Sequence, residues 1–409
     1  MAEATVPADR YAAFRVRDFR LFAVVVLLSA VLQQTQAVAL GWDMYNRTGS
    51  AMALGLIGLS QFVPAMLFFL PAGEIADRFD RRKVMIASFV LWGTASTGLA
   101  AAAIAGAGAG WLYFFAAVST TGHVINRPAR DALLPQLVPG PVFPNAVVWS
   151  SSLYQLASIS GPAVAGSMIA VYGGASIVYG TNAVLILVAL VLATRIPARA
   201  ALPARRATTW SDLFAGLAHV WRTPVVLGVM SLDLLAVIFA SATALLPLYA
   251  RDILHVGPRE LGWLSAAPAM GALGMAFLQG AREPRHVGRA FFISIAGYGL
   301  ATAVFGMSTS FWLSLAALVG VGAMDNISVV IRQTVVQLYT PDEVRGRVSA
   351  VNRVFIQSSN QLGAFESGAL AMLTTPVFAV VAGGIVTVAI AAAGVRIFPE
   401  LRRLGSLPR

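Results

Sequence analysis

The chain has 409 residues, of which 58% are hydrophobic and only 11% are charged, and it contains no cysteine. Soluble domains carry roughly 25% charged residues, so this composition excludes an ordinary soluble protein, and the absence of cysteine excludes disulfides and thiolate metal sites. The net charge of +11 lies in loops and towards the two termini rather than in one basic domain, so we expect no nucleic-acid partner. The remaining class is an integral protein of the lipid bilayer.

Apolar runs of about 20 residues, each long enough to cross a bilayer, recur along the whole chain. We predict an all-α polytopic membrane protein with twelve transmembrane helices, centred near Leu28, Leu67, Thr94, Val118, Ile159, Leu187, Leu235, Met270, Gly299, Val321, Asn360 and Ile385. The expected outer loops hold only Arg47, Arg251 and Arg259 of the 29 lysines and arginines. This asymmetry predicts that both termini are cytoplasmic. An arginine-over-lysine, alanine-rich composition favours a bacterial cytoplasmic (inner) membrane.

The first apolar run carries a polar stripe. Four of its residues fall within about 80° of one another at 100° per residue and therefore share one helix face. They are Ser29, Gln33, Gln36 and Asp43. Such a face is too polar for lipid, so we expect it to line a cavity, with Asp43 towards the outer end. Asp43 is either an interfacial carboxylate or a site that binds and releases a proton.

A short, densely charged loop separates the second and third runs. Its sequence is Gly73-Glu74-Ile75-Ala76-Asp77-Arg78-Phe79-Asp80-Arg81-Arg82-Lys83. A stop-transfer charge cluster is the simpler interpretation. However, the loop resembles the Gly-x-x-x-Asp-Arg-x-Gly-Arg-Arg signature of the major facilitator superfamily, with Asp80 where the pattern prefers glycine. The resemblance implies a gating loop that begins at Gly73, in which Asp77 contacts the other half and holds the cytoplasmic side shut. Arg78, Arg81 and Arg82 would organise the inner surface.

Polar residues also share one face of the fourth predicted helix and one face of the tenth. The fourth helix carries Ser119, His123, Asn126 and Arg130, and the tenth carries Asp325, Ser328 and Arg332. His123 and Asp325 are separated by an offset that recurs between the two halves, so we expect them to face each other and to share a proton or a cationic substrate. A structural polar cluster is the alternative. A metal site would need a third ligand that the pattern does not supply, so we predict no metal.

The fifth predicted helix contains Gly161-Pro162-Ala163-Val164-Ala165-Gly166. This resembles the Gly-Pro-x-x-Gly-Gly element of proton-antiporting drug exporters, with Ala165 replacing one glycine. Proline removes a backbone hydrogen bond, and small residues permit close packing, so Gly161, Pro162 and Gly166 are candidates for a hinge. Plain helix packing is the alternative. The counterpart of Pro162 in the second half is Ala364, and this asymmetry favours export over import.

The two halves of the chain match each other. An offset of 202 pairs Arg130 with Arg332, Pro139 with Pro341, Gln155 with Gln357, Gly161 with Gly363 and Gly166 with Gly368. A parallel, pseudo-twofold repeat of two six-helix halves is the major facilitator fold, in which the substrate cavity lies between the halves. We therefore predict an N-terminal half at 1–194, a cytoplasmic linker at 195–223 and a C-terminal half at 224–409.

The second half supplies further candidates for a cavity that carries substrate or protons. Asp233 of the seventh predicted helix aligns with Ser29 at an offset of 204. Gln357 and Asn360 share a face of the eleventh helix with Arg353, whereas Glu366 projects about 180° from Gln357. Glu366 is therefore expected to pack against another helix, and it ranks below Asp43 and Asp325 as a proton carrier.

Two inner-loop patterns extend the resemblance to the enterobactin-exporter and macrolide-efflux branch of the superfamily. They are Arg127-Pro128-Ala129-Arg130-Asp131-Ala132-Leu133-Leu134-Pro135, with Asn145 after it, and Thr340-Pro341-Asp342-Glu343-Val344-Arg345-Gly346-Arg347-Val348. The resemblance implies a monomeric, proton-coupled exporter of amphipathic small molecules of the drug or siderophore class. A lysophospholipid or lipid flippase or a metabolite carrier is the alternative, and a transporter-derived receptor is a more remote one. The sequence has no nucleotide-binding loop and no catalytic constellation, so we predict neither a cofactor nor an enzyme.

Overall fold

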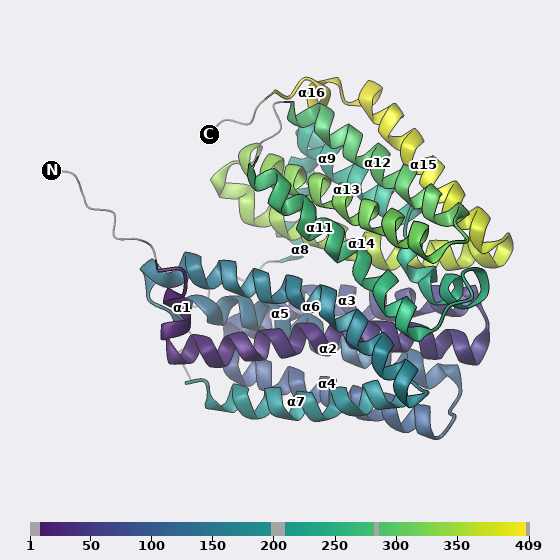
Figure 1. The fold of residues 1–409 in the computed structure, drawn as a ribbon. Coiled ribbons are helices and arrows are strands. Elements are labelled where there is room, and N and C mark those ends of the chain that lie inside the picture. Colours follow the sequence, from purple (N-terminus) through teal and green to yellow (C-terminus); the bar gives the residue numbers. More distant parts are fainter. Residues whose placement is uncertain (1–8, 198–208, 282–285, 406–409) are drawn as a thin grey trace.

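The computed structural model describes residues 9–197, 209–281 and 286–405, and within these ranges it contains helices and no β-strand (Figure 1). An N-terminal group comprises α1 (Ala12–Arg15), α2 (Arg17–Thr48), α3 (Ala51–Arg78), α4 (Arg81–Ile104), α5 (Ala109–Leu137), η1 (Gly140–Val142), α6 (Phe143–Tyr172) and α7 (Ser176–Arg195). Arg199, Pro203, Arg205 and Arg206 of the predicted linker lie outside the described residues.

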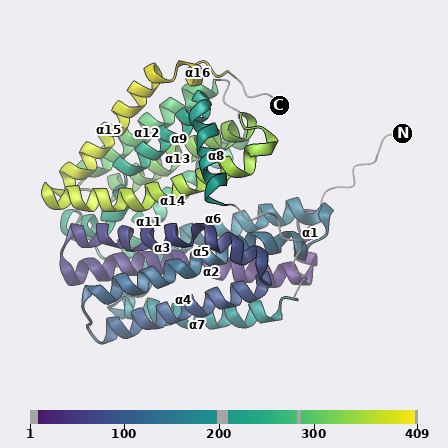
Figure 2. The ribbon, with the colours of Figure 1, turned by 180° about the vertical axis from the view of Figure 1, so that it is seen from behind.

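A C-terminal group follows. It comprises α8 (Trp210–Arg222), α9 (Pro224–Phe239), η2 (Ala242–Leu245), α10 (Leu246–Leu248), η3 (Tyr249–Ile253), α11 (Pro258–Ala281), α12 (Val287–Met307), α13 (Phe311–Leu338), α14 (Asp342–Leu373), α15 (Pro376–Ile397) and α16 (Pro399–Arg402). The two groups form two layers, with α3 and α6 of the first facing α14 and α11 of the second (Figures 1 and 2).

Nine helical segments of the described chain are long and apolar enough to cross a membrane: α2, α3, α4, α7, Pro224–Ile253, α11, α12, α13 and α15. Three further helices, α5, α6 and α14, are 29, 30 and 32 residues long but more polar. Their polarity has a physical reason, since they carry polar side chains that face a cavity instead of lipid. The chain is thus a multi-pass membrane protein, and the count of twelve spans stays a prediction.

Helix pairings within the N-terminal group have counterparts in the C-terminal group. In the first group, α2 packs on α6 and α7, while α4 packs on α5 and α7. In the second group, α9 packs on α14 and α15, while α12 packs on α13 and α15. These are corresponding helices in chain order, and the two-half repeat itself stays a prediction.

Two ends of the molecule must be distinguished. The end that holds Arg81, Arg130 and Arg345 is called the arginine-rich end, and the opposite end, which holds Arg47 and Asp252, is called the Asp252 end. One apolar core cluster contains residues of both groups, among them Met44, Leu54, Leu248 and Leu264, all towards the Asp252 end. Two other clusters each belong to one group: Phe19, Phe89, Trp92 and Leu133 represent the first, and Met230, Phe291, Val335 and Val348 the second. The groups therefore share a core at the Asp252 end and have separate cores towards the arginine-rich end.

Glycines allow close approaches between the two groups. A Cβ added to Gly262 on α11 would lie 2.5 Å from the carbonyl oxygen of Pro162 on α6, and Gly166 lies beside the same crossing. A Cβ added to Gly368 on α14 would lie 2.7 Å from the Cα of Gly55 on α3. Both crossings require glycine, because real Cβ atoms do not make contacts this short. They form a seam near the Asp252 end.

Candidate functional site

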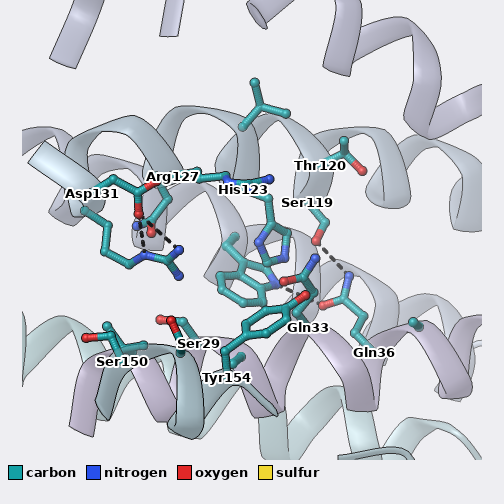
Figure 3. Close-up of a pocket in the computed structure, with 18 of the residues that line it drawn as sticks. Ser29, Gln33, Gln36, Ser119, Thr120, His123, Arg127, Asp131, Ser150 and Tyr154 are labelled. Atoms are coloured by element: carbon teal, nitrogen blue, oxygen red, sulfur yellow. Dashed lines mark hydrogen bonds and ion pairs between the residues drawn. The ribbon is translucent and has the colours of Figure 1, made fainter. Parts of the chain in front are cut away.

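A cavity of about 770 Å³ lies among the helices and extends to the arginine-rich end (Figure 3). Most of its wall belongs to α2, α4, α5 and α6 of the N-terminal group, and α3 and α14 contribute three glutamines. Of the residues predicted for the cavity, the ones that line it are Ser29, Gln33, Gln36, His123, Asn126 and Gln357. The cavity is also lined by five residues that were not predicted from the sequence, namely Gln61, Trp92, Tyr154, Gln155 and Gln361. Gln61, Gln155 and Gln361 are polar residues within apolar runs, and that pattern could have indicated them.

Gln36 is the centre of a hydrogen-bond network that joins three helices. Its Oε1 accepts from Trp92 Nε1 at 3.0 Å and from Ser96 Oγ at 3.1 Å, both on α4. Its Nε2 donates to Ser119 Oγ on α5 at 2.8 Å (Figure 3). The side chain is buried, so these bonds satisfy polar atoms that would otherwise be costly inside the protein. Gln36 therefore fixes the deep wall of the cavity.

The other polar residues of α5 have different partners. The imidazole of His123 lies against the Trp92 indole, with ring centroids 3.8 Å apart. Asn126 is buried, and its Nδ2 donates to Ser88 Oγ on α4 at 2.7 Å. Asn126 thus holds α5 to α4, whereas His123 presents an aromatic ring to the cavity, near Gln33 and Tyr154 in Figure 3.

The cavity ends in a cluster of charges at the arginine-rich end. Arg130 Nη2 lies 3.3 Å from Asp131 Oδ1, and Arg127 lines the same part of the wall (Figure 3). Arg353, on α14 of the opposite group, interacts electrostatically with both Arg127 and Asp131. One of these arginines, Arg130, contacts the carboxylate, and the region as a whole carries more positive than negative charge.

Asp43 does not line this cavity, although we expected it to share the polar stripe of α2. Its Oδ1 accepts from Arg47 Nε at 2.7 Å, one turn further along the helix. Arg47 also donates to the carbonyl oxygen of Ala107 on the next helical hairpin. The cavity does not reach this ion pair because the shared core fills the Asp252 end, so Asp43 is not among the residues that line it.

Asp325 and His123 also do not face each other across the cavity. His123 lines it, whereas Asp325 belongs to a polar cluster inside the C-terminal group. There Arg332 forms an ion pair with Asp233, and Ser328 Oγ lies 3.0 Å from Asp233 Oδ1 and 2.9 Å from the Asp325 carbonyl oxygen. The cavity wall is mainly N-terminal, so these equivalent positions in the two groups have different surroundings.

Two candidates on α14 also lie away from the cavity wall. Asn360 Nδ2 donates to the carbonyl oxygen of Ile356 on its own helix, at 2.8 Å. Glu366 is half-buried and accepts from Ser367 Oγ at 3.4 Å. Only Gln357 of the predicted α14 set contributes to the cavity, together with Gln361 one turn later.

The charged segment that was predicted as a loop is mostly helical, because α3 runs to Arg78 and α4 begins at Arg81. Its side chains anchor the arginine-rich end of the N-terminal group. Arg81 Nη1 donates to the carbonyl oxygen of Ala132 on α5, at 3.4 Å, and Arg82 donates to that of Thr194 on α7. Arg78 pairs with Glu74 at 2.6 Å. Asp80 is the N-cap of α4 and accepts from the Arg82 backbone N–H at 2.9 Å, which explains its departure from glycine.

Asp77 makes no hydrogen bond or ion pair with the C-terminal group anywhere in the described chain, and Gly73 beside it has open space around its Cα. At the opposite end, by contrast, the two groups are linked. Tyr45 on α2 donates to Asp252 of η3, and Arg251 Nη1 donates to Asn46 Oδ1 at 3.3 Å. Direct polar links between the groups are therefore present at the Asp252 end.

Comparison with known proteins places this geometry in a family. The family model described as transmembrane secretion effector matches residues 8–406. The chain is 28% identical over 371 residues to the multidrug efflux pump Tap of Mycobacterium tuberculosis (strain ATCC 25618 / H37Rv), covering 86% of each protein. It is 26% identical over 419 residues to the enterobactin exporter EntS of Escherichia coli O139:H28 (strain E24377A / ETEC), covering 99% of this chain and 95% of that one.

The fold is also similar to a solved structure. A bacterial homologue of the iron transporter ferroportin, crystallised in an inward-facing state, superposes with a TM-score of 0.73 over 95% of this chain and 99% of that chain. At 14% sequence identity, this likeness concerns the fold alone.

Proposed function

Because the chain belongs to the transmembrane secretion effector family of the major facilitator superfamily, we propose that it is a proton-coupled exporter of amphipathic small molecules that works by alternating access. The family and the relatives make it a membrane transporter and not an enzyme. Tap is a multidrug pump and EntS an enterobactin exporter, which supports a substrate of the drug or siderophore class.

The observation that carries the proposal is the unequal separation of the two groups of helices. They share an apolar core and a glycine seam at the Asp252 end, whereas the cavity extends to the arginine-rich end. Cationic loops remain on the cytoplasmic side, so we assign the arginine-rich end and both termini to the cytoplasm. This conformer would then receive substrate from the cytoplasm, as an exporter must at the start of its cycle.

We assign the moving bodies to 1–194 and 224–409, joined by the linker 195–223, whose helix α8 packs on α14 and would move with the C-terminal body. The support is the repeated helix pairing and the equivalent glycines. Gly161 on α6 packs against Gln34 of α2, and Gly363 on α14 packs against Val237 of α9. In this proposal, the residues around Pro162 form the hinge of α6, and Asp77 joins the C-terminal group when the arginine-rich end closes.

Proton coupling is assigned to the polar cluster of the C-terminal group. Asp43 is paired with Arg47, which leaves Asp325, beside Asp233 and Arg332, as the leading carboxylate. A carboxylate that shares one arginine with a second carboxylate can be protonated when that arginine changes partner, and a rocking motion of α13 against α9 would produce such a change. His123 is the alternative carrier because it borders the cavity directly.

The test is transport by the purified protein in proteoliposomes under an imposed pH gradient, with fluorescent dyes, siderophores and lysolipids as probes. Uphill accumulation of a dye or siderophore, abolished by a protonophore, is the expected result. Transport of lysolipids alone would favour the flippase alternative. The absence of any gradient-driven flux across all three classes would contradict the proposal.

A further inference from the structure

We infer that the cavity selects neutral or anionic solutes rich in hydrogen-bonding groups and discriminates against lipophilic cations. This inference rests on the proposed transport function, because it concerns the substrate class of the same cavity. It is carried by three features of the wall, namely a set of glutamine amides, the distribution of charges and an aromatic surface.

Four glutamines form what is called here the glutamine quartet: Gln33 of α2, Gln61 of α3, and Gln357 and Gln361 of α14. None of the four side chains has a hydrogen-bond partner within the described residues, in contrast to Gln36 and Gln155, whose amides are used within the protein. Each free amide offers both a hydrogen-bond donor and a hydrogen-bond acceptor, and the amide group carries no net charge. Because the quartet comes from both groups of helices, a ligand that bonds to it would bridge them.

The charges of the wall oppose a cationic ligand. Among the described residues, Asp131 is the sole carboxylate that lines the cavity, and it is already beside Arg130. Arg127 and Arg353 add two more cations at the same entrance. A lipophilic cation would lose hydration in a cavity whose one lining carboxylate in the described chain is already paired with Arg130, which is costly. An anion would meet guanidinium donors suited to carboxylate or phenolate oxygens.

The remaining wall is aromatic and apolar. The rings of His123 and Tyr154 lie at the cavity (Figure 3). Trp92, Phe22 and Leu40 also line it. Rings of this kind stack on planar groups of a ligand. A cavity of about 770 Å³ falls within the range that accepts drug-sized molecules. The preferred ligand therefore combines aromatic rings with several neutral or anionic oxygen groups.

Two xanthene dyes of similar size and opposite charge test the inference, namely fluorescein and rhodamine 6G. Their affinities for the purified protein are measured by fluorescence anisotropy, in a buffer in which fluorescein is an anion. Wild type should bind fluorescein about tenfold more tightly than rhodamine 6G, as expected for one favourable charge contact. Equal affinities, tighter binding of rhodamine 6G or no measurable binding of fluorescein would each overturn the inference.

Variants identify the residues responsible. Gln357→Glu adds a carboxylate to the wall with almost no change in shape, so it should raise the affinity for rhodamine 6G about tenfold and lower that for fluorescein. Gln337→Glu places the same charge on an exposed position of α13 outside the cavity, and it should leave both affinities unchanged. If both variants shift the dye preference equally, bulk charge and not the cavity sets selectivity, and the inference fails.

Binding and transport are measured separately so that the two ideas can fail separately. Wild type that binds fluorescein but pumps neither dye would contradict the proposed function while leaving the ligand preference intact. Wild type that pumps rhodamine 6G faster than fluorescein would contradict the preference while supporting export.

Discussion

Arg332 of α13 forms an ion pair with Asp233 of α9 in the interior of the C-terminal group, where the two side chains are only 5% and 6% exposed. Ser328 adds a hydrogen bond to the same carboxylate. A buried pair of this kind stabilises the fold little relative to apolar residues, but the loss of one partner leaves an uncompensated charge.

The first prediction follows from this pair. Arg332→Leu should lower the free energy of unfolding by about 3 kcal/mol, because Asp233 is left buried without its counter-charge. The double variant Asp233→Leu with Arg332→Leu should recover most of that loss, since neither charge remains. Thermal unfolding in detergent measures both effects. A double variant as unstable as Arg332→Leu alone would show that the unpaired charge of Asp233 is not the cause of the loss.

Asp325 lies beside this pair, and we predict that it carries the coupled proton. Asp325→Asn should abolish uphill efflux driven by a pH gradient and preserve downhill exchange, because exchange requires no net change in protonation. Proteoliposomes measure both modes in one preparation. His123→Gln is the parallel variant for the alternative carrier. If Asp325→Asn retains uphill transport and His123→Gln loses it, His123 and not Asp325 carries the proton.

The seam between α6 and α11 should not tolerate a side chain. Gly262→Val would place methyl groups against the Pro162 carbonyl, so the two groups could not close at the Asp252 end, and transport should fall at least tenfold. Gly274→Val on the same helix is the matched control, because a Cβ at Gly274 meets open space. Equal transport by the two valine variants would show that the crossing is not part of the cycle.

The fourth prediction concerns the loop between α3 and α4. Asp77 has no polar link to the C-terminal group in the described residues of this conformer, so its contact is expected in the opposite one. Asp77→Asn should slow transport strongly while insertion and the unfolding temperature stay near the wild-type values. Counterflow in proteoliposomes measures transport, and thermal unfolding together with size-exclusion profiles checks the folding of the variant. Transport by Asp77→Asn at the wild-type rate would show that Asp77 is not part of the gate.

The features that could be predicted from the sequence are those that depend on residues within one helix or on the repeat between the two halves. The apolar runs predict the long helices because the thickness of a bilayer dictates their length. The recurring offsets predict that Gly161 and Gly363 occupy equivalent packing positions in the two groups. The polar face of α2 predicts the contributions of Ser29, Gln33 and Gln36 to the cavity. Asp43 shares that face, but the cavity ends before it, and where a cavity ends depends on how two groups of helices meet.

The sequence did not reveal which side chains on different helices contact each other. The expectation for His123 and Asp325 assumed that the two groups contribute equally to one cavity, whereas the wall is mainly N-terminal. Arg332 appeared in the sequence as a face-mate of Asp325, and its contact with Asp233 on another helix emerges only from tertiary packing. The pattern of one helix identifies a polar face, but the pairing of charges requires the neighbouring helix.

Alternating access is the central claim, and distances at the two ends of the molecule test it most directly. The chain has no native cysteine, so spin labels can be placed at Ala105 and Thr309 near the Asp252 end, and at Gly140 and Gln337 near the arginine-rich end. Double electron–electron resonance in liposomes then measures the distance between the two labels of each pair, with and without a pH gradient and fluorescein. We predict that the first distance lengthens as the second shortens. Distances that stay fixed, or that change in the same direction at both ends, would contradict alternating access.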